Sequence, residues 1–157
     1  MNEALKRAID KQFGEEEPKL SKKRTREIVG SVKYASKCSL ELGKESPEDI
    51  SVYCLSRSDD YRKKGDFYKA VAHALGVGHA ALEGEYHEQP KGLPFNQYTI
   101  QFNKKEQEKY LKMADKRIDL ALEAAHKSKK TDVFDETALK VIDEFKKEYR
   151  NYKKKAA

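Results

Sequence analysis

Three residues in the middle of the chain have the types and spacing of metal ligands. His79, Glu83 and His87 follow one another at intervals of four residues, so an uninterrupted helix would align their side chains in one column. Imidazole and carboxylate groups both bind divalent metal ions. Gly84 can end the helix before His87, however, and an ordinary contact between His79 and Glu83 explains the same spacing. Metal binding at these three residues is therefore the alternative hypothesis.

Residues for catalysis would have to come together from separate parts of the chain. Tyr61 and Asp66, together with His79 and Glu83, are the polar groups from which an enzyme site could form. The sequence contains no Walker A, HExxH, GxSxG or CxxC pattern, each of which marks a particular site chemistry. We therefore favour a non-catalytic protein and predict no cofactor.

Two further patterns have structural explanations. Residues 76–81 read Gly-Val-Gly-His-Ala-Ala, the outline of a dinucleotide-binding fingerprint, but they follow a helical pattern instead of the strand that such a site needs. Cys38 and Cys54 lack the spacing of a zinc site or a disulfide scaffold. We expect both cysteines to be small buried side chains in a reducing compartment.

Two clusters of basic residues could bind a polyanion. They are Lys22, Lys23, Arg24 and Arg26 near the N-terminus, and Lys153, Lys154 and Lys155 at the C-terminus. Clustered basic residues bind nucleic-acid backbones, and neighbouring aromatic rings can stack on bases. Tyr149 and Tyr152 precede the C-terminal cluster, although their spacing also suits a helical core. RNA or DNA binding and simple solvation of two helical faces are both open.

The overall composition indicates a helical protein without a membrane-spanning segment. The 157 residues include 33 Lys and Arg against 27 Asp and Glu, and apolar and charged residues each make up 38%. Apolar side chains at this density must form narrow stripes, which suits amphipathic helices. The chain has neither a transmembrane-length apolar run nor an apolar segment at its N-terminus. We expect a cytoplasmic, basic protein with one domain over residues 1–157.

Periodicity and capping signals predict about six helices. Their expected positions are about 2–13, 21–42, 47–64, 66–83, 103–126 and 132–152. Short connections favour an antiparallel all-α bundle. Its core would be a central helical hairpin at residues 25–86, followed by a C-terminal helical pair at 103–155. Alternating apolar and polar residues predict one extended segment near 97–102, lying on the bundle without a partner strand.

The sequence around residue 65 predicts the turn of the central hairpin. Gly65 suits the C-terminal end of one helix, and Asp66 suits the N-cap of the next. The second helix carries small residues on one face, which are Ala70, Ala74, Gly78 and Ala81. A glycine inside a helix costs about 1 kcal/mol relative to alanine. We therefore expect a neighbouring helix to approach closely at this face.

The same hairpin carries a family resemblance. The run Tyr61-Arg-Lys-Lys-Gly-Asp-Phe-Tyr-Lys-Ala70, an alanine-rich helix and the ending Leu82-Glu-Gly84 resemble the archaeal proteins grouped as domain of unknown function 357. The resemblance covers residues 25–86 and departs from the family at Ala80-Ala81, where the family often has a large aromatic residue. It implies a helical fold and an archaeal source, and it brings no catalytic residues.

The function predicted from the sequence is that of a helical binding module. A protein partner could bind along the hairpin, or RNA or DNA could bind at the basic ends. Self-association is a further possibility, since Tyr98, Ile100, Phe102 and the apolar stripe of the last helix offer surfaces for a second copy.

Overall fold

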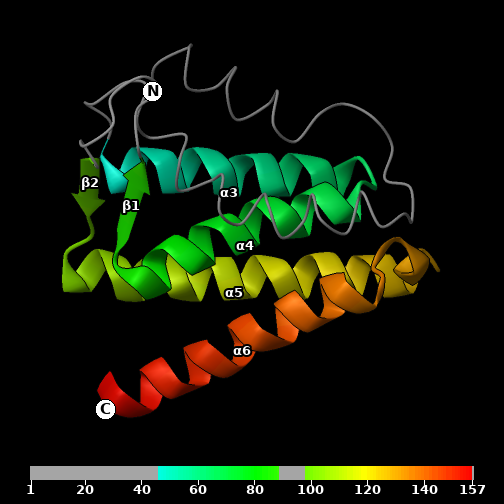
Figure 1. Ribbon diagram of the computed structural model, residues 1–157. Coiled ribbons are helices and arrows are strands. Elements are labelled where there is room, and N and C mark those ends of the chain that lie inside the picture. The colour runs from blue at the N-terminus through cyan, green and yellow to red at the C-terminus, as the bar shows by residue number, and fades with distance from the viewer. Residues whose placement is uncertain (1–45, 89–97, 157) are drawn as a thin grey trace.

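The computed structural model describes residues 46–88 and 98–156 of the chain (Figure 1). These residues are mostly helical, as predicted. The helices are α3 (Pro47–Lys63), α4 (Phe67–Glu83), α5 (Lys104–Lys127) and α6 (Glu136–Ala156), with a short 3-10 helix η1 (Thr131–Val133). The prediction of about six helices is not matched, because the described residues contain four α-helices. The helices expected at 2–13 and 21–42, and Cys38, lie outside the described residues.

Local capping determines where α3 begins. The hydroxyl oxygen of Ser46 accepts a hydrogen bond from the backbone N–H of Asp49 at 3.1 Å. Pro47 occupies the first helical position, where its missing N–H leaves no bond unmade.

None of the helices among residues 46–88 and 98–156 is long and apolar enough to cross a membrane.

A tight reversal joins α3 to α4. Gly65 has a φ angle of 81°, a left-handed conformation that glycine adopts without steric cost. Asp66 then caps α4, because its Oδ1 accepts a hydrogen bond from the backbone N–H of Lys69 at 3.1 Å. The reversal makes α3 and α4 an antiparallel pair (Figure 1).

A short antiparallel ribbon connects α4 to α5. It consists of β1 (Glu85–Glu88) and β2 (Tyr98–Gln101), with Tyr86 opposite Ile100. The predicted extended segment is thus present, but the expectation that it lacks a partner strand was wrong. The four residues of β1 directly follow the helix end at Gly84. So short a strand gives too few alternations to be recognised from sequence.

Helix α4 is central among the described elements. Figure 1 shows α4 between α3 and α5, and it shows α6 running at an oblique angle to α5. Side chains all around α4 are buried, among them Ala72, Leu75 and Val77, as expected for a helix with neighbours on several sides. The core continues into the flanking elements through Ile50, Cys54, Leu55, Tyr86, Tyr110, Leu111 and Ile118.

Gly78 marks a close approach between α4 and α6. A Cβ atom at residue 78 would lie 2.5 Å from Cε2 of Phe145 on α6, which is too close for van der Waals contact. Ala74 and Ala81, on the same face of α4, are fully buried. The small-residue face therefore does receive a neighbour, and at Gly78 that neighbour is the Phe145 ring.

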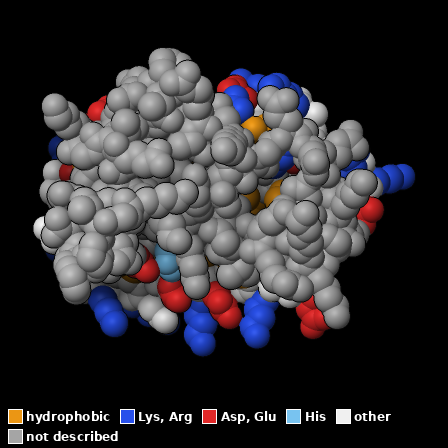
Figure 2. All heavy atoms as spheres, turned by 45° about the horizontal axis from the view of Figure 1, so that its top comes forward, with side chains coloured by type: hydrophobic (Ala, Val, Ile, Leu, Met, Phe, Trp, Pro, Cys, Tyr) orange, Lys and Arg blue, Asp and Glu red, His pale blue; other side chains and the backbone are white. Residues whose placement is uncertain are grey.

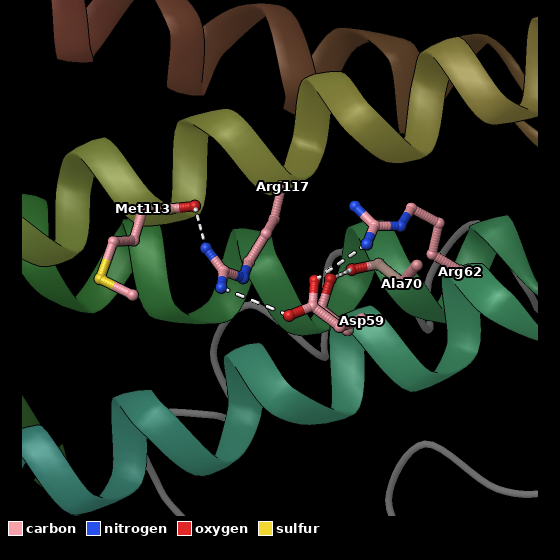
Figure 3. A network of polar contacts seen from close by, with 6 residues as sticks. Asp59, Arg62, Ala70, Met113 and Arg117 are labelled. Atoms are coloured by element: carbon pink, nitrogen blue, oxygen red, sulfur yellow. Dashed lines mark hydrogen bonds and ion pairs between the residues drawn. The ribbon is translucent and has the colours of Figure 1, made fainter.

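A polar network ties α5 to α3 (Figure 3). Asp59 on α3 lies between Arg62 of the same helix and Arg117 of α5, with N–O distances of 3.5 and 3.3 Å. Arg117 also donates a hydrogen bond to the carbonyl oxygen of Met113, one turn earlier in α5, at 3.4 Å. The network positions α5 relative to α3 by charge-assisted contacts.

Candidate nucleic-acid interface

Side-chain contacts define how α5 and α6 lie against each other. The hydroxyl of Tyr152 on α6 lies 3.3 Å from Oε1 of Gln107 on α5. The Nζ atom of Lys146 lies 2.5 Å from Oδ1 of Asp115 and 2.6 Å from Oδ1 of Asp119. The two helices are therefore antiparallel, and the second half of α6 lies beside the first half of α5.

This arrangement gathers basic residues at one end of the helical pair. Residues 104–116 contain five lysines and three acidic residues, and residues 146–155 contain six basic residues and one acidic residue. Residues 117–145, which form the other end, contain five basic and seven acidic residues. We call residues 104–116 and 146–155 the basic end. A polyanion is attracted to such a concentration of one charge sign.

The surface of the molecule also carries acidic side chains. Figure 2 shows one face, along whose lower edge Lys and Arg side chains stand beside Asp and Glu side chains. Interspersed charges of both signs are what a solvated surface normally carries. The excess of basic residues at the basic end is instead given by the charge counts of residues 104–116 and 146–155.

Four lysines of the basic end form a stripe along α5. They are Lys105, Lys109, Lys112 and Lys116, and all four are exposed. Their intervals of four, three and four residues place them on one helical face. This stripe was not predicted from the sequence, because acidic residues lie among its members along the chain. The spacing itself was the signal that could have revealed it.

A groove lies between the first half of α5 and the last turns of α6. It is open to solvent, has a volume of about 280 Å³ and is lined by Glu108, Lys112, Tyr149, Tyr152, Lys153 and Ala156. The Nζ atom of Lys153 lies 4.4 Å from the centroid of the Tyr149 ring, within cation–π range. The groove thus combines aromatic rings with two ammonium groups.

The tyrosines of the groove stay neutral near neutral pH. Burial raises the pKa of the Tyr149 hydroxyl, and the nearby charge of Asp115 adds to this effect. Burial also raises the pKa of Tyr152, with a further contribution from Glu108. Formal charge in the groove therefore comes from its two lysines and from Glu108.

Lys146 is committed to joining the two helices. Burial lowers the pKa of its ammonium group, but the hydrogen bonds and charges of Asp115 and Asp119 outweigh burial, so the pKa is raised. Lys146 is therefore positively charged at neutral pH and is held by both carboxylates. The charge available to a ligand comes from the exposed lysines around it.

The two predicted basic clusters have different outcomes. Lys153, Lys154 and Lys155 are exposed in the last turn of α6, at the basic end. Lys22, Lys23, Arg24 and Arg26 lie outside the described residues. Only the C-terminal cluster can therefore be related to the groove.

The helical column proposed for metal binding is interrupted. The Nε2 atom of His79 lies 2.9 Å from Oε1 of Glu83, but α4 ends there. Gly84 caps it in a left-handed conformation, and His87 lies in strand β1. Within the described residues, no group of three His, Cys, Asp or Glu side chains could hold a metal ion. The contact between His79 and Glu83 is the pair expected at four-residue spacing.

The residues of the predicted enzyme site are not brought together. Asp66 precedes α4 and Glu83 ends it, and a helix of 17 residues is about 25 Å long. Tyr61 lies near the Asp66 end, where its carbonyl oxygen accepts a hydrogen bond from the Asp66 N–H at 2.9 Å. His79 is near the opposite end of the helix, so the four residues do not form one site.

The chain matches no protein-family model, and comparisons with curated proteins and with solved structures found no match. The resemblance of the central hairpin to an archaeal family therefore stays a prediction.

Proposed function

We propose that this chain is a non-catalytic helical module that binds nucleic acid through the basic end. The observation that carries the proposal is the α5–α6 groove, which two tyrosines and two lysines line together, namely Tyr149, Tyr152, Lys112 and Lys153. Proteins that hold nucleic-acid strands commonly combine a basic groove for the backbone with aromatic side chains for the bases.

A protein partner along the central hairpin has less support. The small-residue face of α4 is the surface that would let a partner helix approach closely. Phe145 of α6 already lies against Gly78 on this face. The metal-binding alternative also has less support, because Gly84 ends α4 before His87.

Fluorescence anisotropy with a labelled RNA strand, measured from 50 to 300 mM KCl, tests the proposal. We expect the logarithm of the binding constant to fall linearly with the logarithm of salt concentration, because bound lysines release counterions. Replacing Lys153, Lys154 and Lys155 with alanine should weaken binding. It should also reduce the magnitude of the slope by about 2, since each lysine bound to a phosphate of a single strand accounts for roughly 0.7 of the slope.

A matched control removes the same charge from the other end of the helical pair. Lys127, Lys129 and Lys130 are exposed near the α5–α6 connection, and their replacement with alanine should leave the slope nearly unchanged. Equal reductions in affinity for the two triple variants, or no salt-dependent binding by the unchanged protein, would refute the proposal. Circular dichroism checks that both variants remain folded.

A further inference from the structure

We infer that the α5–α6 groove holds one unpaired base, so that the protein binds single-stranded nucleic acid in preference to duplex. This inference rests on the proposed function and specifies the form of nucleic acid that the basic end recognises. It follows from the size of the groove, from which of its two tyrosine rings is exposed, and from the placement of its charged residues.

The size of the groove suits a small ligand group. Its volume of about 280 Å³ is at the lower limit of ordinary small-molecule pockets. A base in a duplex is paired and stacked, and it must be unstacked before it can enter a pocket. An unpaired base enters without that cost, so the groove favours a single strand.

The two tyrosines of the groove differ in what their rings can do. The Tyr149 ring is 8% exposed and is stacked on Phe145 at a centroid distance of 6.1 Å. Lys153 also lies over the Tyr149 ring, so this ring is already covered by side chains of the protein. Tyr152 is partly exposed and lines the groove. Its ring is therefore the one available to stack on a base.

The orientation of Tyr152 is set by a chain of hydrogen bonds through three helices. Its hydroxyl lies 3.3 Å from Oε1 of Gln107, and the amide nitrogen of Gln107 donates to the carbonyl oxygen of Ala81 on α4 at 2.7 Å. An aromatic ring held in place before binding loses little conformational freedom when the ligand arrives. Gln107 is thus a positioning residue for Tyr152.

The charges of the groove favour a base inside and phosphates outside. Lys112 and Lys153 line the groove and can reach the backbone on either side of an inserted nucleotide. Glu108 also lines it, and its carboxylate would repel a phosphate. A carboxylate does accept hydrogen bonds from base N–H groups such as the cytosine amino group. The edge of a base is therefore the better partner for Glu108.

Binding of one RNA sequence as a single strand and as a duplex, at the same salt concentration, tests the inference with three proteins. Tyr152→Ala removes the ring, and we expect single-strand affinity to fall roughly tenfold, within the range measured for base–aromatic stacking. Duplex affinity should change little. The chain has no tryptophan, so Tyr152→Trp keeps a stacking ring and introduces a unique fluorophore. We expect this variant to retain single-strand affinity and its indole fluorescence to be quenched by the strand.

Three results would overturn the inference while leaving the proposed function intact. They are an unchanged single-strand affinity in Tyr152→Ala, an equal decrease in affinity for strand and duplex, and an indole that does not respond to the strand. Displacement of the strand by polyglutamate at equal charge concentration would instead count against both the inference and the proposed function, because it would show that any acidic polymer, including an acidic protein, fits the surface. Absence of salt-dependent binding to either nucleic acid would instead refute the proposed function itself.

Discussion

Buried polar residues of α4 pack as part of the core. Lys69 is 2% exposed, and its Nζ atom lies 3.6 Å from Oδ2 of Asp66 and 5.4 Å from the centroid of the Tyr61 ring. His73 is fully buried, and its Nδ1 atom lies 2.8 Å from the carbonyl oxygen of Lys69. Because a carbonyl oxygen can only accept, Nδ1 carries the imidazole proton. These groups are positioned by their own helix and by the α3–α4 turn.

The neutral state of His73 predicts a loss of stability in acid. Burial lowers the pKa of His73 from 6.5 to about 3, helped by the charges of Arg57 and Lys69 and opposed by the hydrogen bond to the Lys69 carbonyl. As the pH falls below 6.5, His73 is therefore protonated in the unfolded chain, whereas in the folded chain it stays neutral until about pH 3. The contribution is fully present above pH 6.5 and falls by up to roughly 1.4 kcal/mol per pH unit below it.

Urea denaturation at pH 7, 5.5 and 4.5 measures this contribution. His73→Phe removes the group, so the free energy of unfolding should decline less steeply with falling pH than in the unchanged protein. His79→Gln alters a histidine on the same helix that is 35% exposed, and it should retain the steep decline. An unaltered pH dependence in His73→Phe would contradict the assignment.

Among the described elements, α6 has side chains that contact two different helices. Phe145 contacts Gly78 on α4, while Lys146 and Tyr152 contact α5. The same attachment forms one wall of the groove. The packing of α6 on α4 therefore bears directly on the proposed binding surface.

Gly78→Ala tests that packing. The alanine would favour the helical state of α4 by about 1 kcal/mol, but its Cβ would overlap the Phe145 ring at 2.5 Å. Crowding in a packed core typically costs 1–3 kcal/mol, so we expect net destabilisation of roughly 1 kcal/mol in chemical denaturation. Weakened RNA binding should accompany it if relief of the overlap moves α6 and not only the Phe145 ring.

A double-mutant comparison isolates the contact. Phe145→Leu shortens the side chain that overlaps the new Cβ atom. It should therefore lower the free energy of unfolding less in the Gly78→Ala variant than in the unchanged protein. Simple additivity of the two free-energy changes would show that the ring does not limit residue 78.

At the scale of the whole molecule, α3 and α5 are connected directly although both also pack on α4. The connection is the contact of Arg117 with Asp59 at 3.3 Å (Figure 3). The two side chains are 21% and 28% exposed, so solvent screens this pair less than a fully exposed one. The pair links residues 58 positions apart in the sequence.

Replacing both partners should reveal coupling between these two helices. We expect Arg117→Met and Asp59→Asn each to destabilise the protein, and their coupling energy in a double-mutant cycle to be about 1 kcal/mol. Arg62→Met is the control. Arg62 contacts Asp59 from within α3, so its replacement leaves the connection between α3 and α5 in place. Arg62→Met should lower the free energy of unfolding less than Arg117→Met does. An equal or larger decrease would argue against the connection between α3 and α5.

The four α-helices among the described residues, and the points where they begin, could be predicted from the sequence. Asp66 caps α4 as expected, Ser46 caps α3, and Asn103 and Glu106 exchange the reciprocal hydrogen bonds of a capping box at the start of α5. These signals are readable because each cap joins residues three positions apart in the chain. The left-handed turn at Gly65 is equally local.

The pairing of β1 with β2 and the location of the candidate site could not be predicted from the sequence, because both depend on contacts between distant residues. The lysine stripe of α5 and the lysines that end α6 are ordinary surface residues when each helix is considered alone. They form one basic end because Tyr152 meets Gln107 and Lys146 meets Asp115, contacts that span 45 and 31 residues. No periodicity within a single helix encodes which half of another helix will lie beside it, since that depends on how all the apolar faces pack together.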